Sequence, residues 1–114
     1  MSRTKLKKLT AAQKMEYLDL LWTSIAELKT REEVKNFFKD LLSECEAVML
    51  SRRIMVARYL LEDKSYETIG RLMLVSPGTI AKIHQWLISG FGGYETAIKK
   101  INKAFKNELV FNKK

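Results

Sequence analysis

The sequence predicts an all-α protein of about six helices. Apolar residues recur at intervals of three and four, which is the period of an amphipathic helix. Segments in which β-branched apolar residues alternate with polar ones are absent, and there is only one proline. Ser or Thr stands where most of the periodic segments begin, as expected for helix N-caps. The 114 residues fit a single domain, 1–114, and a hydrophobic content of 46% excludes general disorder.

Two helices are predicted at the start of the chain. The first runs from its N-cap, Thr10, to about Leu28. It has one apolar face that must pack on another surface, formed by Met15, Leu18, Trp22 and Ile25. The second and shorter helix begins at a capping box made by Thr30 and Glu33. Its apolar residues are Val34, Phe37, Phe38 and Leu41.

The third predicted helix is apolar around much of its circumference. It begins at a second capping box, Ser43 with Glu46, and continues to about Glu62. One apolar stripe is formed by Ala47, Leu50, Ile54, Ala57 and Leu61. A second stripe is formed by Met49, Val56 and Leu60. A helix of this kind is either central in a fold or buried against another subunit.

Three further helices complete the prediction. Ser65 caps a short one, "YETIGRLM", and Ser76 caps the next, in which Pro77 occupies the first helical position because its missing N–H has no partner there. The glycine-rich segment "SGFGGY" ends that helix. The last helix covers residues 94–109. Its expected inward residues are Ala97, Ile101, Ala104 and Phe105, and its outward residues are Lys99, Lys100, Lys103 and Lys106.

Residues 65–88 have the apolar spacing of a helix-turn-helix. Its small core is expected to consist of Ile69, Met73, Val75, Ile80 and Ile83. Gly70 is small at the point where the two helices cross, whereas Leu74 stands where the turn of such motifs commonly has glycine. On the second helix, the face opposite Ile80 and Ile83 is polar and basic. It carries Gly78, Lys82, Gln85 and Ser89, with Thr79 and Ala81 at its margins.

The exposed stripe and the charge of the chain both point to double-stranded DNA. The formal net charge of +8 attracts polyanions. In a major groove, Lys82 can donate to guanine or phosphate and Gln85 can pair with adenine. We therefore expect Gly78, Thr79, Lys82 and Gln85 to face bases, and Ser76 and Arg71 to lie near phosphates. Residues 1–9 form a basic arm that either follows the DNA backbone or is a solvated tail.

The segment "LLSECEAVMLSRRIMVARYLLEDKSYETIGRLMLVSPGTIAKI" resembles the Trp repressor superfamily, and within it the Trp-repressor-related YerC/YecD-type branch. The resemblance extends from about Asn36 to Leu87. It implies an intertwined homodimer in which the first, second, third and last helices of two chains share one core. Such a core would account for the third helix, which is apolar on two sides.

The resemblance also implies an effector pocket. In the tryptophan-binding member of the superfamily, two arginines enclose the indole, and their counterparts here are Arg53 and Lys82. Lys82 lacks the planar guanidinium that stacks on a ring or clamps a carboxylate, and Ile83 replaces a glycine and would crowd the indole. Free tryptophan is therefore a poor match. Another small-molecule corepressor, or none with Ile83 filling the pocket, remains open.

The predicted function is a sequence-specific transcriptional regulator, a repressor that binds a palindromic operator as a homodimer. No apolar run is long enough to span a membrane, and no signal peptide is present, so a cytoplasmic location on chromosomal DNA is expected. Cys45 and His84 are each the only residue of their type. We therefore expect no metal site, no cofactor, no catalytic residues and no enzymatic activity.

Two other functions fit parts of the sequence. Helix-turn-helix motifs also occur in the DNA-targeting modules of transposases and recombinases, although the chain lacks clustered carboxylates for metal-assisted strand cleavage. A basic helical protein-interaction module, similar to an antitoxin, would instead bind an acidic protein. That module predicts no affinity for duplex DNA at physiological salt.

Overall fold

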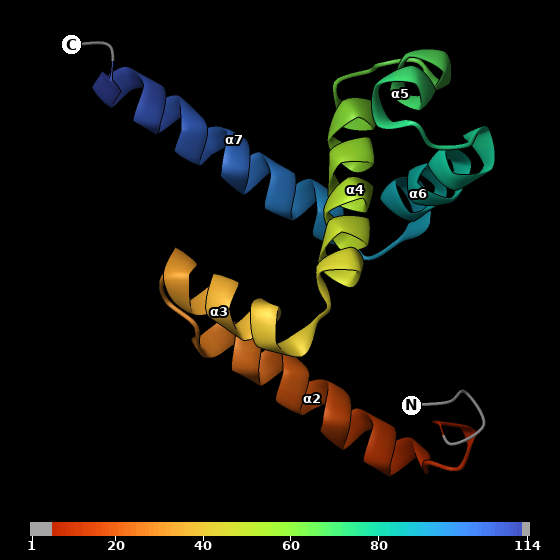
Figure 1. The fold of residues 1–114 in the computed structure, drawn as a ribbon, viewed down its shortest axis with the longest axis vertical. Helices are drawn as coiled ribbons and strands as arrows, with labels where there is room; N and C mark the ends of the chain where they lie inside the picture. The colour runs from red at the N-terminus through yellow and green to blue at the C-terminus, as the bar shows by residue number, and fades with distance from the viewer. Residues whose placement is uncertain (1–5, 113–114) are drawn as a thin grey trace. The chain divides into compact units, whose positions relative to one another are not determined.

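The computed structural model describes the backbone of residues 6–112 and the side chains of residues 6–104. In this part of the chain there are six α-helices and no strand: α2 (Ala11–Glu27), α3 (Arg31–Leu41), α4 (Glu44–Leu61), α5 (Tyr66–Met73), α6 (Pro77–Ser89) and α7 (Gly93–Asn112) (Figure 1). The predicted all-α class with about six helices is confirmed. The chain divides into two compact units, residues 1–44 and 45–114. Of the predicted basic arm, residues 1–5 lie outside the described part.

The first unit contains α2 and α3, which begin where the sequence predicts. The Thr10 hydroxyl accepts a hydrogen bond from the Gln13 amide at 3.1 Å, and the Gln13 side chain accepts one from the Thr10 amide at 2.9 Å. The Thr30 hydroxyl accepts from the Glu33 amide at 3.1 Å. These caps satisfy amides that have no partner inside the helix.

The apolar side chains of α2 are largely exposed. Neither α2 nor α3 contains a buried residue. Met15 and Trp22, both on the predicted apolar face, are 71% and 59% exposed. Propensity alone stabilises isolated helices weakly, so an amphipathic helix of this kind depends on a surface that covers its apolar face.

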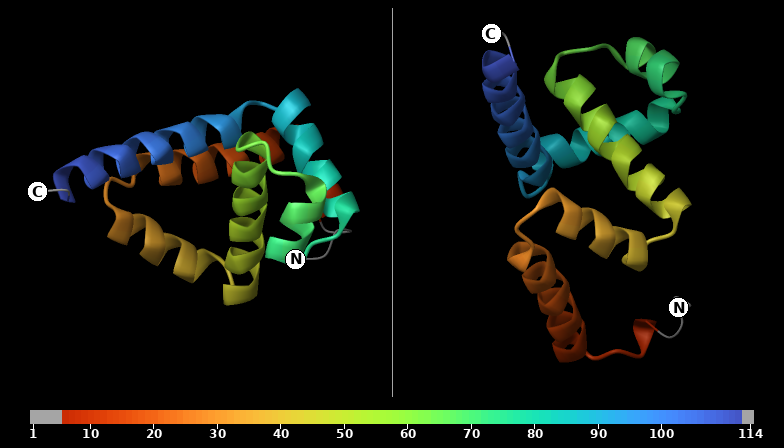
Figure 2. Two further views of the ribbon diagram at one scale, coloured as in Figure 1. Left: turned by 90° about the horizontal axis from the view of Figure 1, so that it is seen from above. Right: turned by 60° about the vertical axis from the view of Figure 1, so that its left-hand side comes forward.

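The second unit is built around the packing of α5 and α6 on α4 (Figure 2). Its core is contributed by all four helices, namely by Val56, Ala57, Ile69, Ile80, Ile83 and Ile98. The predicted helix-turn-helix core is confirmed, because Ile69, Ile80 and Ile83 are buried and Met73 and Val75 pack against them. A Cβ atom on Gly70 would lie 3.4 Å from the carbonyl oxygen of Val75, so the small residue fits a close backbone approach.

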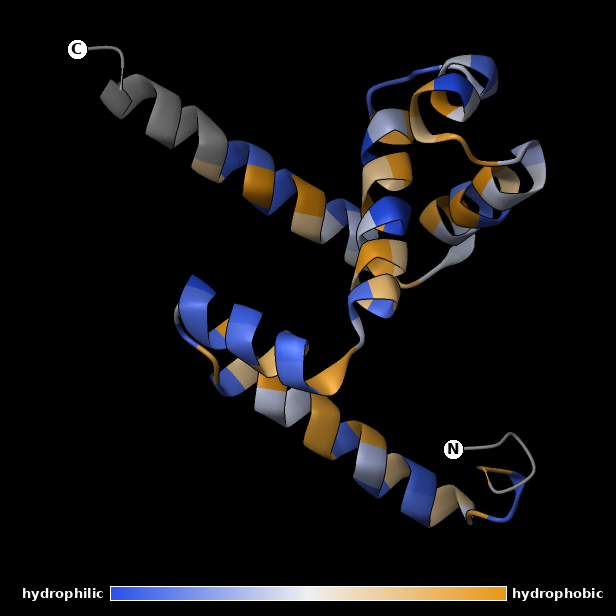
Figure 3. Ribbon diagram, viewed as in Figure 1, coloured by the Kyte–Doolittle hydropathy of each residue, from blue (hydrophilic) through white to orange (hydrophobic). Residues whose placement is uncertain are grey.

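Helix α4 contributes one residue from each of its two predicted apolar stripes to this core. Val56 and Ala57 are fully covered. Five other large apolar residues of the helix are 40–52% exposed, namely Val48, Met49, Leu50, Ile54 and Leu61. Figure 3 shows apolar colour along much of α4, interrupted by polar residues. The helix is therefore apolar around most of its circumference, as predicted, while α5 and α6 cover one side.

Helix α7 follows a glycine-rich connection. The amide of Gly90 donates to the carbonyl of Trp86 at 2.9 Å, and a side chain at Gly90 would collide with that carbonyl oxygen. Gly92 adopts a positive φ of 77°. Both glycines therefore have a backbone reason to be present, and the predicted end of the preceding helix is correct.

The inward face of α7 differs from the prediction. Ile98 is buried and Tyr94, one turn earlier, packs against the same core, whereas the predicted inward residues Ala97, Ile101 and Ala104 are exposed in this chain. The apolar series that starts at Ala97 lies on the neighbouring face, about 100° around the helix. Lys99 is exposed as predicted and pairs with Glu95 at 3.0 Å. Phe105 and Lys106 lie outside the described side chains.

None of the helices within residues 6–112 combines the length and the apolar character that crossing a bilayer requires.

The core of the second unit can be tested on α5, which carries a buried and an exposed apolar residue. Ile69 is fully buried, whereas Leu72, on the same helix, is 55% exposed. We expect Ile69→Ala to lower the free energy of unfolding by about 2–5 kcal/mol, because it removes buried methyl groups and leaves a cavity. Leu72→Ala should change it by less than about 1 kcal/mol. Urea unfolding followed by circular dichroism measures both, and equal losses would contradict the assigned core.

Candidate nucleic-acid interface

Helix α6 begins after an N-cap serine, Ser76, which a proline follows. The Ser76 hydroxyl accepts a hydrogen bond from the Thr79 amide at 3.2 Å and shares another with the Thr79 hydroxyl at 3.0 Å. Pro77 is the first helical residue. This local network explains the Ser-Pro opening without any contact to a ligand. Ser76 therefore has a structural role in addition to its predicted place near phosphate.

The four residues predicted to face bases are all exposed. Gly78, Thr79, Lys82 and Gln85 lie on α6, whose other side buries Ile80 and Ile83 in the core. Arg71 is exposed in the last turn of α5. The helix therefore presents a polar and basic side to solvent because its apolar side is fixed in the core.

The turn between α5 and α6 contains a leucine in an unfavourable backbone conformation. Leu74 has φ 54° and ψ 45°, which is the left-handed region that costs most residues about 1–2 kcal/mol relative to glycine. Its side chain is 86% exposed, so burial does not offset this cost. The turn is coloured as apolar in Figure 3. The departure from glycine noted in the sequence is thus a position of real backbone strain.

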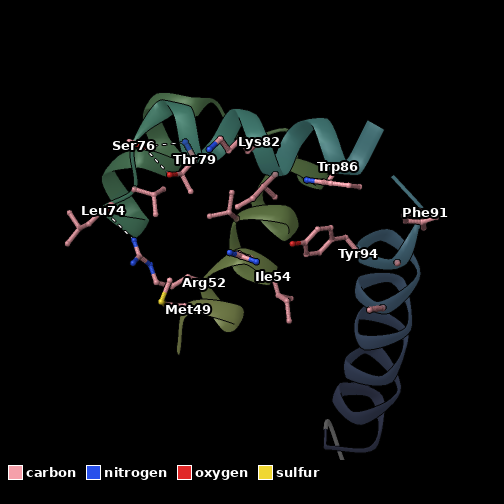
Figure 4. Close-up of a pocket in the computed structure, with 17 residues that line it drawn as sticks. Met49, Arg52, Ile54, Leu74, Ser76, Thr79, Lys82, Trp86, Phe91 and Tyr94 are labelled. Atoms are coloured by element: carbon pink, nitrogen blue, oxygen red, sulfur yellow. Dashed lines mark hydrogen bonds between the residues drawn. The ribbon is translucent and has the colours of Figure 1, made fainter. Parts of the chain in front are cut away.

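Arg52 of α4 holds this turn from the other side. Its Nη2 atom donates to the carbonyl oxygens of Met73 at 3.4 Å and Leu74 at 3.3 Å (Figure 4). Carbonyls at the end of a helix have no partner within the helix, and a cation placed there also interacts favourably with the helix dipole. Sequence reasoning missed Arg52, because its partners are 21 and 22 residues away.

A second contact joins α5 to α6. The Tyr66 hydroxyl and Nδ1 of His84 share a hydrogen bond of 2.7 Å, and the two rings meet edge to face with centroids 5.7 Å apart. His84 is half-buried. In this chain it connects the first residue of α5 to the middle of α6.

The three predicted effector-pocket residues line one cavity. Its volume is about 1060 Å³, and α4, the turn, α6 and the start of α7 surround it (Figure 4). Arg53, Lys82 and Ile83 are all part of its wall. Ile83 is only 6% exposed, so most of its side chain lies in the core behind this wall.

The cavity is apolar and cationic. Its positive charges come from Arg52, Arg53 and Lys82, and no Asp or Glu lies among the described residues that line it. Its large apolar residues include Met49, Ile54, Trp86 and Phe91. Trp86 is 59% exposed in the single chain and lines this space. Such a wall attracts small anions that carry an apolar group.

Metal-binding chemistry is not found in the described part of the chain. No group of three or more His, Cys, Asp or Glu side chains within residues 6–104 could hold a metal ion. Cys45 is a free, exposed thiol at the start of α4.

The helix-turn-helix core, with its exposed basic helix, defines the chain as a helical protein with the architecture of a DNA-binding regulator. Residues 16–102 match the family model described as Trp repressor protein. The chain is 36% identical over 86 residues to the uncharacterized protein YerC of Bacillus subtilis (strain 168), which covers 75% of this chain and 83% of that protein. The chain belongs to the Trp repressor family, and its resemblance to the YerC-type branch is confirmed.

Solved structures show the same fold. A TrpR-like protein from Eubacterium eligens ATCC 27750 superposes with a TM-score of 0.70 at 29% identity, over 76% of this chain and 90% of that chain. A candidate Trp repressor from Staphylococcus aureus also gives 0.70 at 30% identity, over 82% and 96%. The matching family model and the Staphylococcus aureus neighbour are both described as Trp repressors.

The strain at Leu74 can be measured by substitution. We expect Leu74→Gly to raise the free energy of unfolding by about 0.5–1 kcal/mol, because glycine adopts a positive φ without a Cβ clash and little buried surface is lost. Leu74→Ala is the matched control, since it shortens the side chain but keeps the Cβ atom, and it should give no gain. Urea unfolding compares the two variants, and a destabilised Leu74→Gly protein would show that the leucine side chain matters more than the backbone.

Proposed function

We propose that the chain is a sequence-specific DNA-binding repressor that acts as a homodimer in the cytoplasm. In each subunit, α6 reads the bases in the major groove. The observation that carries this proposal is that one side of α6 is buried and the opposite side is exposed. Ile80 and Ile83 are fixed in the core of the helix-turn-helix, while Gly78, Thr79, Lys82 and Gln85 remain exposed. Membership of the Trp repressor family supports the same function.

The exposed residues supply the two kinds of contact that a specific complex needs. Lys82 donates to guanine and Gln85 pairs with adenine, which reads base edges. Gly78 allows the backbone to approach closely. Arg71 and the N-terminus of α6 bind phosphates, which fixes the register but carries no sequence information. The net charge of +8 strengthens association with any duplex.

The exposed apolar surface supports a homodimer. Met49, Leu50 and Ile54 on α4 and Trp22 on α2 are each between 42% and 59% exposed in the single chain. Apolar surface of this extent on a small protein indicates an interface. A two-fold dimer carries two copies of α6, and these reach half-sites of a palindromic operator about 34 Å apart.

The cavity supports control by a small anionic effector. Arg53 and Lys82 line its wall, and Lys82 also belongs to the exposed stripe of α6. An anion that binds Lys82 therefore changes the position or the charge of a DNA-reading side chain. Lys82 and Ile83 favour a ligand other than free tryptophan, because the indole needs the planar guanidinium and the space that these two residues do not provide.

The alternative functions make different predictions. A transposase or recombinase module requires a catalytic partner, since no carboxylate cluster for metal-assisted cleavage occurs in the described residues. If the chain is instead a module that binds an acidic protein, the exposed side of α6 has no measurable affinity for duplex DNA at physiological salt. DNA binding of the intact chain therefore separates the proposal from the second alternative.

The reading residues are tested by affinity measurements. We expect Lys82→Ala and Gln85→Ala each to weaken binding to a selected duplex by about 1–3 kcal/mol, because each removes a contact with a base edge. Gln85→Ala should in addition relax the preference at one base pair of each half-site. Fluorescence anisotropy at about 150 mM salt measures these changes, since non-specific attraction is weak there.

The control for this titration is Lys99→Ala. Lys99 carries the same charge on α7, where it pairs with Glu95. It should leave the sequence preference unchanged. If Lys82→Ala and Gln85→Ala behave like the control, α6 does not read the operator.

The homodimer is tested by sedimentation equilibrium. We expect a molar mass of twice the 13.3 kDa chain at micromolar concentration. Leu50→Glu places a charge in the middle of the exposed apolar side of α4 and should shift the protein toward the monomer. A wild-type protein that sediments as a monomer at these concentrations argues against the proposed arrangement of two reading helices.

A further inference from the structure

We propose that Arg52 is a positioning residue for α6, which holds the strained turn at Leu74 and so fixes the direction in which the reading helix leaves α5. This inference rests on the proposed DNA-binding function. It means that Arg52, a residue of α4, affects operator affinity through the turn and not through a contact of its own with DNA.

The geometry places Arg52 directly on the turn. Both of its hydrogen bonds, 3.4 Å to Met73 and 3.3 Å to Leu74, go to main-chain carbonyl oxygens (Figure 4). Met73 is the last residue of α5, and Leu74 follows it as the C-cap. Both bonds come from the single nitrogen Nη2, whose two N–H groups can donate to two neighbouring carbonyl oxygens. One side chain thus connects α4 to the end of α5.

The turn links α5 directly to α6, so its backbone conformation affects the angle at which α6 begins. Leu74 lies two residues before Ser76, the N-cap of α6. A rotation of the backbone at this point would move Gly78, Lys82 and Gln85 together, because all three lie on α6. The left-handed conformation of Leu74 is disfavoured, and its exposed side chain does not secure it. The two hydrogen bonds from Arg52 are contacts that favour this conformation over alternatives.

Arg53 provides a matched comparison within the same sequence. It is the next residue of α4, has the same charge, and lines the same cavity. Among the described residues it makes no hydrogen bond or ion pair, whereas Arg52 makes two. Neutralising either arginine removes one positive charge beside the cavity. Only the loss of Arg52 releases the turn.

The experiment compares Arg52→Gln, Arg53→Gln, Leu74→Gly and the double variant Arg52→Gln/Leu74→Gly. Affinity for a selected duplex and for a scrambled duplex of equal length is measured as a function of salt. We expect Arg52→Gln to weaken binding to the selected duplex by about tenfold, as for the loss of one charge-assisted contact. Binding to the scrambled duplex and the slope of log affinity against log salt should not change.

The Leu74→Gly background separates positioning from direct contact. Glycine adopts the left-handed conformation without strain, so the turn no longer depends on Arg52. We expect Arg52→Gln to have less than about a threefold effect in that background, and Arg53→Gln to have the same effect in both. Two results would overturn the inference. One is an equal effect of Arg52→Gln in both backgrounds. The other is a salt slope reduced by about one, which indicates that Arg52 touches a phosphate.

A second measurement does not depend on DNA. Amide hydrogen exchange in the free protein reports how well the turn and the first turn of α6 are held. We expect the amides between residues 74 and 79 to exchange faster in Arg52→Gln but not in Arg53→Gln. If the wild-type protein shows no preference between duplexes, the proposed function fails and this measurement still decides the role of Arg52. Equal exchange in the two variants would show that Arg52 does not hold the turn.

Discussion

The packing of α5 and α6 against the middle of α4 is the contact on which the other features of the second unit depend. Ile69 brings α5 to Val56 and Ala57, and Ile80 and Ile83 bring α6 to the same place. Once one side of α6 is buried, helical geometry leaves its opposite side in solvent. That opposite side carries Lys82 and Gln85. Burial of these isoleucines therefore sets which side of α6 faces solvent.

Helix α4 connects this core to the rest of the proposed mechanism. Val56 and Ala57 form the base of the core, while Leu50 and Ile54 remain exposed on the same helix. Arg52 extends from α4 to the turn that precedes α6, and Arg53 extends into the cavity that Lys82 also lines. An apolar partner, a small anion and a DNA duplex would each act on residues within a few turns of one another. In the proposed regulator, dimerisation, effector binding and DNA binding are coupled through α4.

Much of the fold was predictable because its determinants are local. Thr10, Thr30, Ser65 and Ser76 each accept a hydrogen bond from an amide three residues later, so the sequence alone locates these helix starts. The core of the helix-turn-helix was predictable for a similar reason, since Ile69, Ile80 and Ile83 are close in sequence and spaced at helical intervals. The prediction that Arg53, Lys82 and Ile83 meet came from the family resemblance.

The features that were missed depend on how helices pack against each other. The partners of Arg52 lie 21 and 22 residues further along, and Tyr66 and His84 are 18 residues apart, so no local pattern relates them. The inward face of α7 was assigned to the series from Ala97, because two adjacent faces of that helix carry apolar residues. Packing on the core selects the face of Tyr94 and Ile98 instead. The sequence marked Leu74 as unusual, but only the structure shows its positive φ.

Selection of bound sites from a pool of random duplexes, at about 150 mM salt, tests the central claim most directly, because phosphate attraction is weak there and base readout persists. The account predicts enrichment of a two-fold symmetric motif whose half-sites are separated by one helical turn, about 34 Å. Recovery of the starting pool without enrichment, by a chain that is folded and dimeric, would contradict the claim that α6 reads sequence.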